Sequence, residues 1–161
     1  MRTFLTVVLL LISTLPLVTS QVAALTDLTV PLGEVKVIDQ DTKLNGRITV
    51  SGTLVLDGAD FRTYDGHYPN GSAFFDIRGT LKVINGARLH GDIRFQILQG
   101  GSLEVFNSAL DDYPHHTGKV ISPCYGSIEI VNSSISADRG IISTTGANIT
   151  IINTTIETEK D

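Results

Sequence analysis

Side chains able to carry chemistry concentrate in two polar stretches of the chain, residues 62–74 and 111–125. Both stretches combine histidine, aspartate and tyrosine, and a further histidine, His90, lies between them. Imidazoles and carboxylates that converge can hold a transition metal ion, and two carboxylates can serve as acid and base in hydrolysis. The composition of these stretches therefore raises two candidate chemistries, a metal site and a hydrolytic centre.

The spacing of these residues argues against both chemistries. The weak metal candidates are His115, His116 and Asp111, and the weak catalytic candidates are Asp111, Asp112 and His90. The histidines and the aspartates occur as adjacent pairs, which is not the spacing of a metal-binding motif. We therefore predict no catalytic site, no metal and no cofactor, and we interpret the polar stretches as surface loops.

The elements that must position these loops are internal repeats. A phrase of the form Gly-x-Leu-x-Val-x-Asn begins at Gly79, Gly101 and Gly126, in a related form at Ala147, and in a shortened form at Gly52. The starts are 27, 22, 25 and 21 residues apart. Such spacings lie in the period range of a solenoid, in which each repeat packs on its neighbours.

Within each phrase, apolar residues alternate with polar ones, which indicates a β-strand with one buried face. Copies stacked in register would form three inward columns of apolar side chains. These columns are Leu54, Leu81, Leu103, Ile128 and Ile149; Leu56, Val83, Val105, Ile130 and Ile151; and Phe61, Leu89, Leu110, Ile135 and Ile156. Among the outward positions, Lys82 beside Glu104 is a favourable cross-strand pair, whereas Glu104 beside Glu129 is unfavourable.

An asparagine closes each full repeat, at Asn85, Asn107, Asn132 and Asn153. These positions follow the repeat, so we expect a stacked ladder of buried, hydrogen-bonded amides, with Asp57 as its first member. Over residues 46–156 the pattern resembles the right-handed parallel β-helix of the pectate-lyase-like superfamily, whose turns carry asparagine ladders. The resemblance implies an all-β fold, a right-handed parallel β-helix (β-solenoid) of about five to six coils.

The resemblance extends weakly to polygalacturonases, which use an Asp-Asp pair and a His-Gly corner. Asp111-Asp112 and His90-Gly91 are similar elements, but here the His-Gly pair precedes the aspartates, whereas in that family it follows them. The other family motifs are missing, and the chain has no tryptophan to stack against sugar rings. The resemblance therefore implies the fold and leaves glycan binding or polysaccharide cleavage as an alternative function.

The start of the chain is typical of a secretory leader. Arg2 precedes the mostly apolar residues 4–18, a run shorter than a membrane span requires. We predict a helical signal peptide over residues 1–24 and a single β-solenoid domain over 25–161, with 25–45 as its N-terminal cap or first coil. An uncleaved anchor is the alternative. After cleavage no transmembrane span would remain, so we expect a secreted or cell-surface protein.

Both polar stretches interrupt the repeats after the third apolar column. We therefore expect residues 62–74 and 111–125 to leave the solenoid as inserted loops at one corner, two coils apart. The coil between them turns tightly at His90. Loops on a rigid scaffold are common binding sites, so we predict one binding patch at this edge. Its residues are His67, Tyr68, His90, Tyr113, His115 and His116.

Composition narrows the choice of partner. The net charge of −5 disfavours nucleic acid and anionic lipid, which require a basic face. We predict a structural or interaction protein that presents its loops to a surface protein or a glycan. A self-assembling surface filament is a further alternative, which the charged residues 157–161 disfavour because charge at a strand edge opposes pairing. The sequence leaves the oligomeric state open.

Two further features concern modification. Sequons begin at Asn70, Asn132, Asn148 and Asn153. Because the ladder positions Asn132 and Asn153 are expected to be buried, we predict glycosylation at Asn70 first and at Asn148 second. The single cysteine, Cys124, is expected either to pack as a small apolar residue under a loop or to link two chains.

Overall fold

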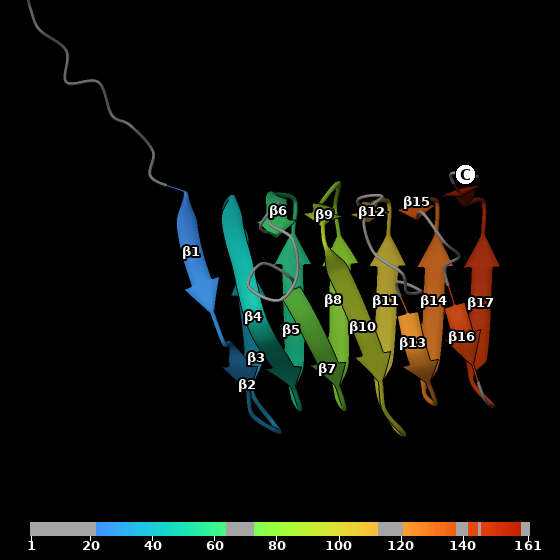
Figure 1. Cartoon of the computed structure of the whole chain (residues 1–161), viewed down its shortest axis with the longest axis horizontal. Coiled ribbons are helices and arrows are strands. Elements are labelled where there is room, and N and C mark those ends of the chain that lie inside the picture. Colours follow the sequence, from blue (N-terminus) through green and yellow to red (C-terminus); the bar gives the residue numbers. More distant parts are fainter. Residues whose placement is uncertain (1–21, 64–72, 113–120, 138–141, 145, 159–161) are drawn as a thin grey trace, which may run out of the picture.

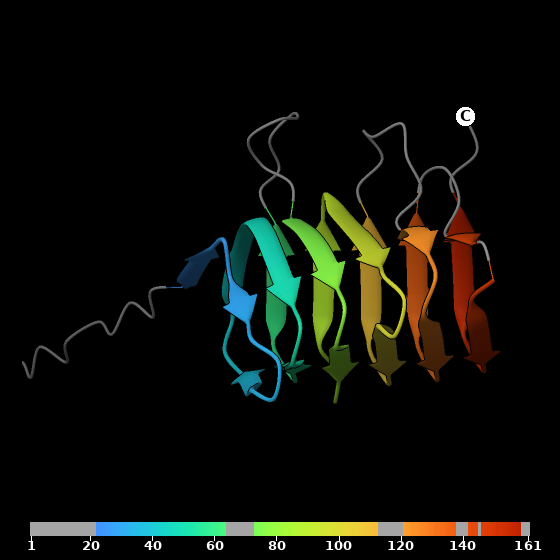
Figure 2. The same ribbon diagram turned by 90° about the horizontal axis from the view of Figure 1, so that it is seen from below.

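The computed structural model describes residues 22–63, 73–112, 121–137, 142–144 and 146–158. Throughout these ranges the chain is built from short parallel strands that wind around one axis in about five turns (Figure 1). Each turn contributes a strand to each of three faces, which enclose a core between them (Figure 2). The prediction of an all-β parallel solenoid is confirmed.

We refer to the three faces as A, B and C. Face A contains β1 (Ala23–Thr26), the first part of β4 (Thr42–Val50), β6 (Asp60–Thr63), β9 (Arg88–Gly91), β12 (Ala109–Asp112), β15 (Ser134–Ala137) and β18 (Thr155–Thr158). Face B contains β2 (Thr29–Val30), the second part of β4, β7 (Ala73–Ile77), β10 (Ile93–Ile97), β13 (Ile121–Cys124) and β16 (Ile142–Thr144). Face C contains β3 (Val35–Ile38), β5 (Thr53–Asp57), β8 (Thr80–Ile84), β11 (Ser102–Phe106), β14 (Ser127–Val131) and β17 (Asn148–Ile152).

The core consists of the predicted apolar columns. Strand register places Leu54, Leu81, Leu103, Ile128 and Ile149 in line, and the other two columns align in the same way. Face B adds a third wall that includes Phe75 and Phe95, whose ring centroids lie 5.0 Å apart. These side chains are fully buried through most of the length, so the burial of apolar surface holds successive turns together.

Glycine at the start of the phrases that begin at Gly52, Gly79, Gly101 and Gly126 is required by close packing at the corner between faces B and C. A Cβ atom on Gly79 would collide with the carbonyl oxygens of Ser51 and Gly52 in the turn below. Gly126 stands in the same relation to the carbonyl oxygen of Gly101. The glycines therefore let the backbone of one turn rest directly on that of the next.

Three predicted boundaries differ from the structure. Strand β1 begins at Ala23, within the predicted leader of residues 1–24, because its backbone pairs with β4. The predicted insert 62–74 is too long, since β6 extends to Thr63 and β7 begins at Ala73. The predicted insert 111–125 is also too long, since β12 extends to Asp112 and Ile121–Cys124 forms β13, a member of face B with one register shift. Residues 1–21 of the predicted leader lie outside the described residues. In the part of the chain that the structure describes, no helix is long and apolar enough to span a membrane.

Candidate functional site

His90 lies on the outer side of face A within a group of paired charges. Its neighbours in register are Arg62 on β6 and Asp111 on β12. The Nε2 atom of His90 is 2.9 Å from Oδ1 of Asp60, and Nη2 of Arg62 is 3.4 Å from Oδ2 of the same carboxylate. Arg88 Nε donates a 2.7 Å hydrogen bond to Oδ2 of Asp111. These side chains contact one another, so the group is a network of polar and ionic contacts on the surface of face A.

The two adjacent aspartates are held in different environments. Successive residues of a strand point to opposite sides, so Asp111 and Asp112 diverge. Asp111 pairs with Arg88 on the outer side of face A, whereas Oδ1 of Asp112 accepts a 3.2 Å hydrogen bond from the backbone N–H of Ile93 at the start of β10. The three catalytic candidates therefore include two register neighbours, His90 and Asp111, but the carboxylates do not face each other across a cleft.

The metal and binding-patch candidates are only partly described. His67, Tyr68, Tyr113, His115 and His116 all lie outside the described residues. Within the described ranges, no group of three or more histidine, cysteine, aspartate or glutamate side chains is arranged to hold a metal ion.

The strands that flank the two inserts do share a corner. Strand β6 ends at Thr63 and β7 begins at Ala73, while β12 ends at Asp112 and β13 begins at Ile121. Both connections lead from face A to face B, and the connection between them, from β9 to β10, is a single residue, Asp92. The two inserts therefore leave the solenoid at the same corner, one turn on each side of a tight connection.

The four ladder asparagines lie in line at the corner between faces C and A. All four have a left-handed backbone, with φ between 49° and 59°. Asn85 Nδ2 donates a 2.8 Å hydrogen bond to Asp57 Oδ1, and Asn153 Nδ2 donates one of 3.3 Å to Asn132 Oδ1. All four side chains are exposed, so the expectation of a buried ladder is wrong. Asparagine tolerates the left-handed region better than most residues, which explains its recurrence at a tight corner.

Buried hydroxyl groups lie instead at two of the residues that follow, Ser108 and Ser133. Ser133 Oγ is buried and donates to the backbone oxygen of Val131 at 2.8 Å, while accepting from the N–H of Ser108 at 3.2 Å. Thr154 Oγ1 repeats this contact with Ile152 O at 2.9 Å. These hydroxyls satisfy backbone groups inside the corner. The signal for them in the sequence is the small or hydroxyl residue after each asparagine, whose role was not predicted from the repeats.

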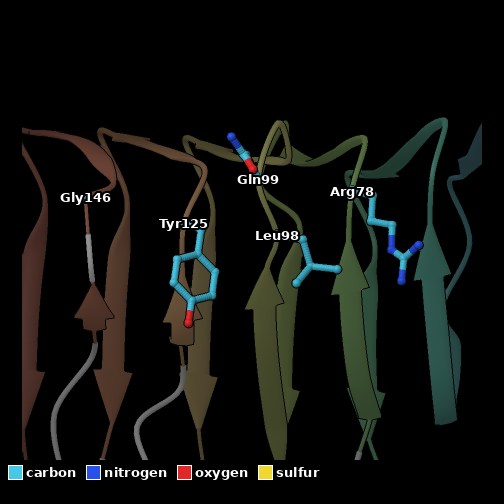
Figure 3. Close-up of a pocket in the computed structure, with 5 residues that line it drawn as sticks. All are labelled: Arg78, Leu98, Gln99, Tyr125 and Gly146. Atoms are coloured by element: carbon cyan, nitrogen blue, oxygen red, sulfur yellow. The ribbon is translucent and has the colours of Figure 1, made fainter.

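An open groove of about 640 Å³ runs along the corner between faces B and C (Figure 3). It is lined by Arg78, Leu98, Gln99, Tyr125 and Gly146, which come from four successive turns. Figure 3 shows the Tyr125 ring and the side chains of Leu98 and Arg78 spread along this edge. Tyr125 is 47% exposed, so about half of its surface is accessible to a ligand. The groove was not predicted from the sequence, although Arg78 and Tyr125 both stand directly before a repeat glycine.

Cys124 and the sequons have clear positions. The Cys124 side chain is fully buried, and burial raises the pKa of its thiol. That position fits the packing interpretation rather than a link between chains. Asn148 is exposed on β17, as expected, but Asn132 and Asn153 are exposed as well, so burial gives no reason to exclude them. Asn70 lies outside the described residues.

Comparison of the chain with family models, with curated proteins and with solved structures found no match. The structure itself shows a parallel β-solenoid. Membership of the pectate-lyase-like superfamily stays a prediction from the repeat pattern.

Proposed function

We propose that this protein is an exported scaffold of the cell surface, which binds a surface protein or a glycan through the two inserts at the corner between faces A and B. The supporting observation is the placement of the flanking strand ends. Thr63 and Ala73 at one insert, and Asp112 and Ile121 at the other, lie at one corner on either side of the short β9–β10 connection. Two longer connections at one corner give a partner two points of contact on one edge.

The rigidity of the solenoid supports a binding role. The turns that carry the inserts rest on fully buried apolar columns, so the bases of the inserts are held at a fixed separation. Turns of a parallel sheet are about 4.8 Å apart, so the bases of the two inserts are roughly 10 Å apart along the axis. A fixed separation of the two bases reduces the conformational entropy that a partner must remove on binding. The pairing of the charges around His90 favours binding over hydrolysis at this edge.

The experiment compares two shortened variants of the chain. Residues 64–72 in one variant, and 113–120 in the other, are replaced by a short turn that copies the β9–β10 connection. Binding to intact cells of the source, and to an array of glycans, should fall at least tenfold in each variant. A Tyr125→Ala variant, which alters the corner between faces B and C, should bind normally. Unchanged binding by both shortened variants would refute this assignment of the binding edge.

Export requires its own test. Residues 1–22 should direct a reporter protein out of the cytoplasm, and a variant with charged residues at Leu9 and Leu10 should not. The mostly apolar residues 4–18 support export, because such a run is typical of a leader. Charge within the run prevents its recognition as a leader, so the charged variant should stay in the cytoplasm. Retention of the unmodified fusion inside the cell would remove the cell-surface part of the proposal.

A second candidate function is glycan binding in the groove between faces B and C. The observation that favours it is the exposed Tyr125 ring beside the aliphatic side chain of Leu98, with a guanidinium and an amide from Arg78 and Gln99 nearby. Aromatic rings bind the apolar face of a sugar, and planar donor groups bind its oxygen atoms. Loss of binding on a glycan array by Tyr125→Ala, with binding kept by Tyr125→Phe, would support this candidate. If Tyr125→Ala binds glycans as well as Tyr125→Phe does, this candidate is excluded.

A further inference from the structure

The last described turn leaves apolar columns uncovered. Ile149, Ile151 and Ile156 continue the three inward columns, yet they are 39%, 38% and 45% exposed. Their counterparts one turn earlier, Ile128 and Ile130 among them, are at most 1% exposed. The difference is the absence of a covering turn over β17 and β18 in the described part of the chain (Figure 1). This end of the solenoid therefore exposes three isoleucines whose equivalents in the preceding turns are buried.

Strand β17 is also well suited to pairing. It is the terminal strand of face C, and its residues, Asn148-Ile-Thr-Ile-Ile152, carry no charge and no proline. Three of the five are isoleucine, a residue that favours extended backbone. A flat, uncharged edge strand with a row of backbone groups open to pairing is a site of association with another strand.

The opposite end of the solenoid differs at its inward positions. On β3, the terminal strand of face C at that end, Lys36 occupies the position in line with Leu54 and the first apolar column. A charge at an inward position of an edge strand opposes pairing. An end-to-end stack that joined β17 to β3 would bring this charge against the first apolar column.

We propose that β17 pairs with β17 of a second copy of this chain, so that the two copies meet through their uncharged face C edges, while Glu157 lies on the neighbouring strand β18. In an antiparallel pair of β17 strands centred on Thr150, Thr150 lies opposite itself, and Ile149 lies opposite Ile151 of the second copy. Both isoleucines point inward, so this register keeps Ile149 and Ile151 of both copies on the inner side. The contact is self-complementary and closes after two copies, as most homodimers do.

The primary experiment uses charge at the predicted two-fold axis. Thr150 is outward and exposed, so Thr150→Lys and Thr150→Glu should each fold, as circular dichroism can verify. Like charges directly opposite in a sheet cost up to about 1 kcal/mol, so each variant should have a dimer dissociation constant raised about fivefold. An equimolar mixture of the two variants should restore or exceed the affinity of the original chain. Sedimentation velocity over a range of concentrations measures the dimer dissociation constants of the two variants and of their mixture.

A control and a cross-link separate this arrangement from others. Val37→Lys places a charge on the exposed edge strand at the opposite end and should leave association unchanged. Thr150→Cys should form a disulfide-linked dimer on mild oxidation, because Cys124 is buried and the new thiol is the accessible one. A chain that stays monomeric at all concentrations, growth beyond two copies, a loss of association in Val37→Lys, or no rescue in the charge mixture would each overturn the proposal.

Discussion

Substitution of Asn107 tests whether the asparagine corner depends on backbone conformation or on the amide group. Asn107 has a φ of 50°, and its side chain is exposed. Glycine adopts this conformation without steric cost, whereas alanine is strained there by about 1 kcal/mol or more. Glycine also adds entropy to the unfolded chain, a cost of about 0.4–1 kcal/mol, which is partly offset because glycine removes the strain that asparagine itself carries at this φ. We expect Asn107→Ala to lower the free energy of unfolding by about 1 kcal/mol, and Asn107→Gly by no more than half that amount.

The assay is urea unfolding followed by circular dichroism, with identical slopes required for the variants to be compared. Asn148→Ala is the matched control, because Asn148 is equally exposed but lies in the extended strand β17 with ordinary φ. Its free energy of unfolding should change by less than about 0.5 kcal/mol. If Asn107→Gly proves as destabilising as Asn107→Ala, the side-chain amide contributes directly, and the explanation by conformation is wrong.

Three further predictions concern the core, a surface pair and the thiol. Gly79→Ala should lower the free energy of unfolding by about 2 kcal/mol or more through collision with backbone oxygens, whereas Gly86→Ala, with open space but a φ of 83°, should lose only about 1 kcal/mol in the same urea assay. Glu129→Lys should raise stability by about 0.5 kcal/mol, because it replaces repulsion with Glu104 by attraction; no gain at low salt would contradict the strand register. Burial holds the pKa of Cys124 above its ordinary value of 9.0, so the native state retains the proton more tightly. Stability from this group is complete below pH 9 and lost as the pH rises beyond it, which predicts a steeper fall above pH 9 for the original chain than for Cys124→Ala.

Much of the architecture could be predicted because the same alternating pattern occurs in several repeats. Alternation placed Leu103 and Val105 inward, and the shared phrase aligned them with Leu81 and Val83, as the register confirms. The predicted pair of Lys82 with Glu104 is present, with 2.8 Å between Nζ and Oε2. Periodicity works here because a one-residue slip would turn every buried side chain outward.

The corners were harder to predict. Sequence identified the asparagine positions but not their exposure, because a ladder and a left-handed corner require the same residue at the same spacing. The direction in which the Asn132 side chain points depends on its backbone φ of 51°, and this angle cannot be read from the sequence. Strand β13 was mistaken for part of a loop because Ser122-Pro123 interrupts its apolar alternation. The groove around Tyr125 arises from four turns, so no single stretch of the sequence reveals it.

The three corners of the solenoid differ in how freely they can change, and that difference bears on where a binding surface can develop. At the corner between faces B and C, glycines such as Gly79 lie against the turn below, and at the corner between faces C and A, left-handed asparagines fix a short bend. An insertion at either would separate stacked backbone groups. At the corner between faces A and B the described tight connections also use left-handed residues, at Asp27, Gly46 and Gly91. Even so, the chain there varies in length, from the one-residue link at Asp92 to the longer connections after Thr63 and Asp112. Length can vary at this corner without loss of register, so it is the edge at which a recognition surface can be elaborated while the core remains unchanged.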